Sequence, residues 1–165
     1  MPIICRLIGL DPATAEQLKT RPSGLEAAVK AAKSYADVYR YWDGIAWLLG
    51  EYRPGTAAAA WLTSGLEVSE AERKIPGARL IFPADLKRLS AELDAIEPDE
   101  LAGSYDAAAL DEADIYPATW VEWEETFDPL GQMLEHYSFL QHFARRSAAA
   151  DQGMLLYFED DGEDF

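Results

Sequence analysis

A long amphipathic stripe near the carboxyl end of the sequence constrains the fold most. Between residues 120 and 149, large apolar side chains recur three or four positions apart, which is the spacing of one helix face. The stripe consists of Trp123, Phe127, Leu130, Leu134, Tyr137, Leu140 and Ala144. Pro129 lies inside this span and has no backbone N–H, so we expect a kink or a break near Asp128. The pattern predicts one or two helices that pack against the rest of the chain.

Apolar runs at the two ends of the sequence predict a small sheet. Residues 2–10 and 154–158 are typical of buried strands, and the two strands are expected to pair. Helices are predicted at 13–20, 56–65 and 86–96. A further helix over 25–35 either ends there or continues into the aromatic block at 35–49. The fold class is therefore α+β: a helix-rich single domain over residues 1–158, followed by an acidic tail at 159–165.

The charge balance limits the partners of this chain. Thirty Asp and Glu stand against fourteen Lys and Arg, giving a net charge of −16 and an isoelectric point near 4.3. Only five of the acids lie in the last seven residues. Such a surface repels nucleic acid and anionic membranes, and it attracts basic proteins. Self-repulsion also favours a monomer or a small oligomer.

The single cysteine indicates a reducing compartment. Cys5 excludes a disulfide within the chain and lies in an apolar run, where a buried and unreactive strand residue is expected. No signal-peptide pattern and no long apolar segment is present in the sequence. These features predict a soluble, cytoplasmic protein.

No motif in the sequence names a reaction. His136 and His142 are six residues apart, roughly 120° around a helix, so they are not expected to share a metal ion. Serine residues lack the glycine context of a nucleophile elbow, and no glycine-rich phosphate loop is present. We therefore predict no catalytic residue, no metal site and no cofactor. Whether the chain is an enzyme stays open, with the balance toward a non-enzymatic role.

Three segments resemble blocks of the YfbM-like bacterial proteins. They are residues 41–49 (YWDGIAWLL), 78–86 (ARLIFPADL) and 115–120 (IYPATW), in the same order as in that family. The resemblance covers about residues 2–158. It implies a small α+β domain of uncharacterised function, with no established active site or cofactor. It also implies that Trp42, Asp43, Tyr116, Pro117 and Trp120 form one cluster, which is either core or pocket.

Two functional hypotheses follow. The first is a non-enzymatic, acidic protein-interaction domain, for example an immunity-type inhibitor of a basic bacterial toxin. Its candidate contact residues are Glu122, Glu124, Glu125 and Asp128, with Glu67, Glu70 and Glu72 as a second group.

The second hypothesis is a small-molecule-binding protein or a hydrolase. Its pocket would be formed by Trp42, Asp43, Tyr116 and Trp120. A glycosidase-like site needs two carboxylates across an aromatic-lined cleft, and the acids on either side of Tyr116 and Trp120, with Trp120 and Trp123 as walls, are the candidates for it. The helical spacing of Tyr39 and Trp42 favours a core position for much of this aromatic block.

Overall fold

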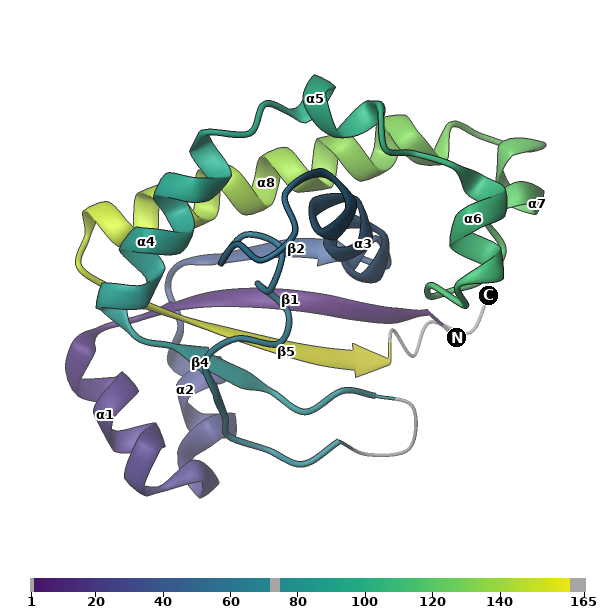
Figure 1. The fold of residues 1–165 in the computed structure, drawn as a ribbon. Helices are drawn as coiled ribbons and strands as arrows, with labels where there is room; N and C mark the ends of the chain where they lie inside the picture. Colours follow the sequence, from purple (N-terminus) through teal and green to yellow (C-terminus); the bar gives the residue numbers. More distant parts are fainter. Residues whose placement is uncertain (1, 72–74, 161–165) are drawn as a thin grey trace.

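The structure is a computed structural model that describes residues 2–71 and 75–160. Within these residues, an antiparallel sheet has five strands in the order β2-β1-β5-β4-β3 (Figure 1). The strands are β1 (Ile3–Leu10), β2 (Tyr35–Tyr39), β3 (Leu66–Glu67), β4 (Arg79–Ile81) and β5 (Gly153–Asp160). The predicted α+β fold is confirmed.

Strands β1 and β5 pair along their full length, as predicted from the two apolar runs. The register extends from Ile3 opposite Asp160 to Leu10 opposite Gly153. Alternate side chains enter two separate cores, one on each face of the sheet. Cys5 is fully buried in the larger core, and burial raises the pKa of its thiol well above the usual value. A protonated thiol is a poor nucleophile, in agreement with the expected strand role.

Helices cover both faces of the sheet (Figure 1). Helices α1 (Pro12–Thr20) and α2 (Leu25–Ala31) lie on one side, joined by a short 3-10 turn at Pro22–Gly24. Helices α3 (Trp42–Tyr52), α4 (Pro83–Asp94) and α8 (Pro129–Ala149) lie on the other. The short helices α5 (Pro98–Ala102), α6 (Ala107–Glu112) and α7 (Trp120–Glu124) complete this layer.

The expected interruption of the long helical stripe is a break between α7 and α8. Pro129 is in the first turn of α8, where its missing N–H costs no helical hydrogen bond. Asp128 caps the helix, because its Oδ1 accepts a hydrogen bond of 2.9 Å from the backbone N–H of Gly131. In the described part of the chain, no helix combines the length and apolar character that a membrane span requires.

Two predictions of local structure are wrong. The helix at 25–35 neither reaches Tyr35 nor continues, because residues 35–39 pair with β1 as the edge strand β2. The alanine-rich segment at 56–65 forms successive turns instead of a helix. Its backbone hydrogen bonds mostly join residues three apart, such as Trp61 N–H to Ala58 C=O, which is the pattern of turns. Glu92 of α4 also accepts a hydrogen bond from the N–H of Ala58.

The last strand extends further than the sequence predicted. Glu159 and Asp160, placed in the acidic tail, are paired with Ile4 and Ile3 as part of β5. Arg6 of β1 forms an ion pair with Glu159, which compensates for an acidic residue in the strand. The remaining tail residues, 161–165, lie outside the described residues.

Candidate functional site

The predicted pocket residues do lie together, beside the start of β1. The rings of Trp42 and Tyr116 are stacked, with centroids 5.1 Å apart and planes inclined by 16°. Both rings bind the backbone of one strand residue. Trp42 Nε1–H donates to the carbonyl of Ile3 at 2.8 Å, and the N–H of Ile3 donates to the Tyr116 hydroxyl at 2.7 Å. The pair thus anchors β1 to α3.

Asp43 and Trp120 extend this cluster. Asp43 Oδ2 accepts a hydrogen bond of 2.8 Å from the backbone N–H of Tyr116. Burial raises the pKa of Asp43, against the opposing effect of that hydrogen bond, and the nearby charge of Asp114 adds to the rise. Trp120 is fully buried and donates from Nε1 to the carbonyl of Ile115 at 2.9 Å.

The polar atoms of the cluster are bonded mainly to one another and to backbone groups. Five surface cavities in the described part of the chain have no lining contribution from Trp42, Asp43, Tyr116 or Trp120. Within those residues, no three His, Cys, Asp or Glu side chains gather in a way that suits a metal ion. The arrangement favours a structural role, while the raised pKa of Asp43 is what the pocket hypothesis expects.

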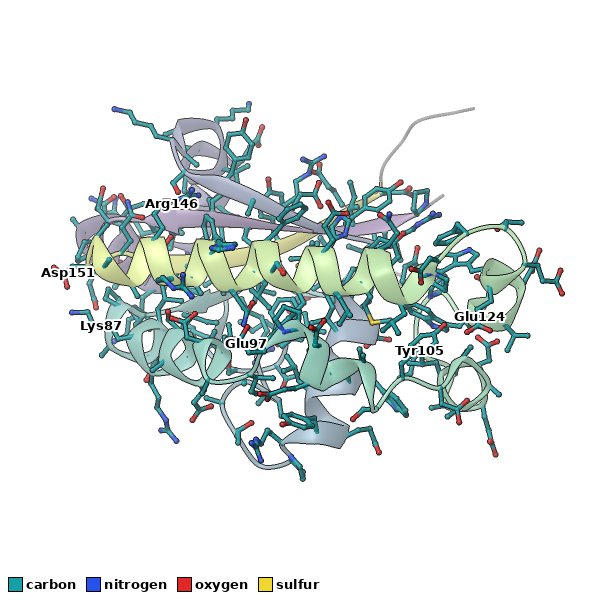
Figure 2. The ribbon with its side chains drawn as sticks, turned by 90° about the horizontal axis from the view of Figure 1, so that it is seen from above. Lys87, Glu97, Tyr105, Glu124, Arg146 and Asp151 are labelled. Carbon is teal, nitrogen blue, oxygen red and sulfur yellow. The ribbon has the colours of Figure 1, made fainter. Side chains whose placement is uncertain are left out.

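The predicted contact acids lie at the corner between α7 and α8. Glu122, Glu124, Glu125 and Asp128 are all exposed. Two of them also have local roles: Asp128 caps α8, and Glu124 accepts a hydrogen bond of 2.8 Å from the hydroxyl of Tyr105 (Figure 2). Glu122 and Glu125 make no side-chain hydrogen bond or ion pair within the described residues.

The acids at this corner act together on Tyr105. Its pKa is raised by burial, by the hydrogen bond to Glu124, and by the charges of Glu124, Asp128 and Asp111. These carboxylates come from α6, α7 and the start of α8. Three separate elements therefore contribute to one negative field.

The second predicted group of contact acids is less well defined. Glu67 of β3 is exposed, with Oε2 3.6 Å from Arg79 Nη1, and Glu70 is exposed in the following loop. Glu72 lies outside the described residues. The pairing of Glu67 with Arg79 makes this group less negative than the α7–α8 corner.

A longer feature, missed in the sequence prediction, connects the acids at the corner. From residue 89 to residue 144 the chain has no Lys and no Arg, although it has fourteen acids. These are Glu92, Asp94, Glu97, Asp99, Glu100, Asp106, Asp111, Glu112, Asp114, Glu122, Glu124, Glu125, Asp128 and Glu135. The segment contains the end of α4, all of α5 to α7 and most of α8 (Figure 1). A count of basic residues along the sequence could have found it.

A row of aromatic rings lies beside this acidic corner. Consecutive ring centroids are 4.9 to 5.9 Å apart along the series Phe139, His136, Tyr41, Trp123 and Phe127. Tyr41 is buried, whereas the other four rings are partly accessible to solvent. The row joins α8 to α7 through the turn between β2 and α3, a contact that the sequence did not predict.

Arg40 lies among the rings of this row. Its guanidinium carbon is 4.4 Å from the ring centroid of Trp123, and it also lies over Tyr39, Tyr41 and Phe127. Cation–π attraction holds the guanidinium there. The acidic surface thus has an aromatic, cation-containing centre instead of a purely carboxylate one.

The family of the protein follows from its sequence. Residues 1–157 match a domain of unknown function, DUF1877. The chain belongs to this family. Among solved structures, the DUF1877 chain is similar to YfbM from Escherichia coli, described as a protein of unknown function. The TM-score is 0.67 and the identity 18%, over 94% of this chain and 99% of that chain. At this identity the likeness shows the fold. Comparison with curated proteins gives no match.

The predicted resemblance to YfbM-like proteins is confirmed by these findings. The DUF1877 fold described here carries the three blocks that led to that prediction in α3, at the β4–α4 junction, and before α7. Two of the blocks meet in the cluster of Trp42, Asp43 and Tyr116.

Proposed function

We propose that this protein is a non-enzymatic, acidic interaction domain that binds a basic protein partner. The observation that carries the proposal is the stretch from residue 89 to 144, which has fourteen acids and no Lys or Arg. Long-range attraction by such a field speeds the capture of a basic partner and disfavours acidic ones. The same field disfavours nucleic acid and anionic membranes as partners.

The α7–α8 corner is the proposed contact surface. Its exposed carboxylates, Glu122, Glu124, Glu125 and Asp128, belong to the same short segment as the partly exposed rings of Trp123 and Phe127. Protein interfaces commonly combine an aromatic centre with a polar rim, and the aromatic residues supply most of the binding energy. The exposed side chain of Val121 on α7 enlarges the apolar part of this surface.

The specific form that we propose is an immunity-type inhibitor, which blocks the basic active site of a bacterial toxin. An inhibitor of this kind works by binding alone, so the lack of a catalytic motif fits the role. A cytoplasmic location, in which the protein protects its own cell, fits the single buried thiol of Cys5. Like-charge repulsion favours action as a monomer or a small oligomer.

Affinity capture with a neutralised variant tests the proposal. The variant carries Glu122→Gln, Glu124→Gln, Glu125→Gln and Asp128→Asn, which keep side-chain size and leave an N-cap on α8. We expect the native protein to retain basic proteins from the source cell at low and at physiological salt. The variant should bind the same proteins at least about tenfold more weakly, mainly through slower association.

A matched control separates this corner from net charge. The control carries Glu16→Gln, Glu26→Gln, Glu51→Gln and Asp85→Asn, which remove four exposed charges from α1 to α4. It should bind nearly as well as the native chain. Recovery of no basic protein at either salt concentration contradicts the proposal, and equal weakening of both variants contradicts the contact surface.

The alternative is a small-molecule site or hydrolase around Trp42, Asp43, Tyr116 and Trp120. The raised pKa of Asp43 supports it, since perturbed carboxyls gather at functional sites. The variants Asp43→Asn and Tyr116→Phe distinguish the two roles. A binding pocket predicts loss of ligand binding with the fold intact, whereas a structural cluster predicts only a lower melting temperature.

A further inference from the structure

A groove lies between the edge strand β2 and helix α8, and its His136 and Phe139 belong to the aromatic row that leads to the acidic corner. Its volume is about 440 Å³, and it is widely open to solvent. Strand β2 contributes Tyr35, Ala36, Asp37 and Tyr39, and α8 contributes His136, Phe139, His142, Phe143 and Arg146. The α8 residues recur at three- and four-residue intervals, so they form one face of the helix. The volume lies within the range of pockets that hold small organic molecules.

The walls of the groove are aromatic and accessible. The ring of Tyr39 is stacked with the imidazole of His136, with planes inclined by 29° and centroids 6.2 Å apart. Phe139 is 43% exposed and Tyr35 is 71% exposed. Large aromatic side chains left open on both walls favour a flat, unsaturated ligand, which can stack on their faces.

The groove is lined by most of the basic side chains that follow residue 89 in the sequence. After residue 89, the side chains that can carry a positive charge are His136, His142, Arg145 and Arg146. Three of these four line the groove. The fourth, Arg145, makes two hydrogen bonds to the carboxylate of Asp94 and lies outside the groove.

The carboxylate that lines the groove is already engaged. Asp37 lies 3.7 Å from Arg6 and also accepts a hydrogen bond from the backbone N–H of Tyr39. At the other end, the guanidinium carbon of Arg146 lies 5.8 Å from the ring centroid of Phe143. Figure 2 shows Arg146 on the side of α8 away from Glu97 and Tyr105. The groove thus combines aromatic walls with one arginine and two imidazoles on an anionic protein.

We propose that this groove binds a small planar carboxylate with an aromatic ring. The ring would stack between the strand and helix walls, near Tyr39 and Phe139. The carboxylate would be bound by Arg146, whose guanidinium suits two parallel hydrogen bonds to such a group, with His142 beside it. This proposal does not rest on the basic partner proposed for the α7–α8 corner, because no acid of that corner lines the groove.

Titration of the full-length, ¹⁵N-labelled protein with indole-3-acetate tests the proposal. We expect saturable binding, with shifted amide signals at β2 and at the α8 residues of the groove. Indole-3-acetamide, which has the same ring without the charge, should bind at least about tenfold more weakly. No binding of indole-3-acetate at millimolar concentration, or equal binding of both compounds, overturns the proposal.

Two neighbouring arginines provide a matched pair of variants. Arg146→Met should weaken indole-3-acetate binding by about tenfold or more, since the charge-assisted hydrogen bonds are lost. Arg145→Met, one residue away but outside the groove, should leave binding unchanged. Equal effects of the two variants contradict the site.

The edge of β2 provides another possible occupant, an extended acidic peptide that adds a strand to the sheet. A capped hexapeptide of alternating Glu and Phe is therefore a third probe. If this peptide shifts the amide signals along β2 and indole-3-acetate shifts none, the proposal of a small carboxylate is wrong and the groove binds a peptide.

Discussion

At the scale of single residues, the backbone of Ile3 shows how the cluster of Trp42 and Tyr116 stabilises the first strand. Its N–H and C=O are bound by the Tyr116 hydroxyl and by Trp42 Nε1–H, and the two rings stack on each other. An unsatisfied buried backbone group costs about 1–3 kcal/mol, so the rings secure the first strand as well as filling the core. Asp43 supports them by binding the backbone of Tyr116.

We predict that Asp43→Asn gains stability relative to the native chain as pH rises from about 4 to 7. The pKa of Asp43 is raised in the folded state, so its contribution to stability is present below the unfolded pKa of about 3.9 and is lost as pH rises through the folded value. Asparagine keeps an acceptor for the Tyr116 N–H without the charge. Urea unfolding of both proteins at several pH values measures the difference.

Asp11→Asn provides a control of opposite sign. Hydrogen bonds from Thr14 lower the pKa of Asp11 at the start of α1, so that its contribution is present above the unfolded pKa and lost as pH falls. This variant should lose stability relative to the native chain as pH rises. If the difference in unfolding free energy between Asp43→Asn and the native chain does not change with pH, the pKa of Asp43 is not raised by burial and the prediction is wrong.

The cluster could be predicted at this scale, but the aromatic row could not. Trp42, Asp43 and Tyr116 belong to sequence blocks that resemble a known family, so their association was expected. Tyr41, Trp123 and His136 come from three elements, and their contact depends on the position of β2. Ring-to-ring contacts of this kind follow from tertiary packing, for which local spacing holds no information.

At the scale of elements, non-local pairing explains the wrong predictions. The aromatic residues at 35–49 have helical spacing, yet residues 35–39 form a strand because β1 supplies hydrogen-bond partners. Tyr39 then adopts a positive φ of 53°, and the chain turns into α3. The N-termini of α1 and α8 were predictable, because a capping Asp followed by Pro is a local start signal for a helix. The pairs are Asp11 with Pro12 and Asp128 with Pro129.

Two glycines of α3 provide a prediction about helix packing. At Gly44, an added Cβ would lie 2.7 Å from Cη2 of the buried Trp120 and 3.1 Å from Sδ of Met133. Gly44→Ala should therefore destabilise the protein by about 1–3 kcal/mol, despite its better helix propensity. Chemical denaturation measures this change.

Gly50 is the matched control on the same helix. No atom lies within 4 Å of a Cβ added there, so Gly50→Ala should stabilise the protein by about 0.5–1 kcal/mol through helix propensity alone. Opposite signs for the two substitutions are expected. Stabilisation by Gly44→Ala would mean that α3 is free to move away from α7 and α8.

At the scale of the whole molecule, charge is distributed unevenly between two halves. Twelve of the fourteen basic residues precede residue 89, whereas the acids continue to the end of the sequence. The first half therefore contains compensating charges, such as Lys30 with Glu26. The second half has little internal compensation, so its folded form contains net repulsion.

We predict that sodium chloride stabilises the protein. Raising its concentration from about 20 to 500 mM shortens the Debye length to a few ångströms and should raise the melting temperature by a few degrees. The variant neutralised at Glu122, Glu124, Glu125 and Asp128 should show a smaller rise. Calorimetry of both proteins measures the effect, and a melting temperature that falls with salt would contradict it.

The pairing of β1 with β5 has a consequence for how the chain is made. The two strands are neighbours inside the sheet, yet the other helices and strands of the described residues all lie between them in the sequence. During translation β1 can therefore pair with β2 early, but its other edge stays unpaired until Leu155 and Leu156 of β5 have been synthesised. Because distant contacts form slowly, the nascent protein is expected to expose this apolar edge, and to benefit from chaperones, until β5 is available.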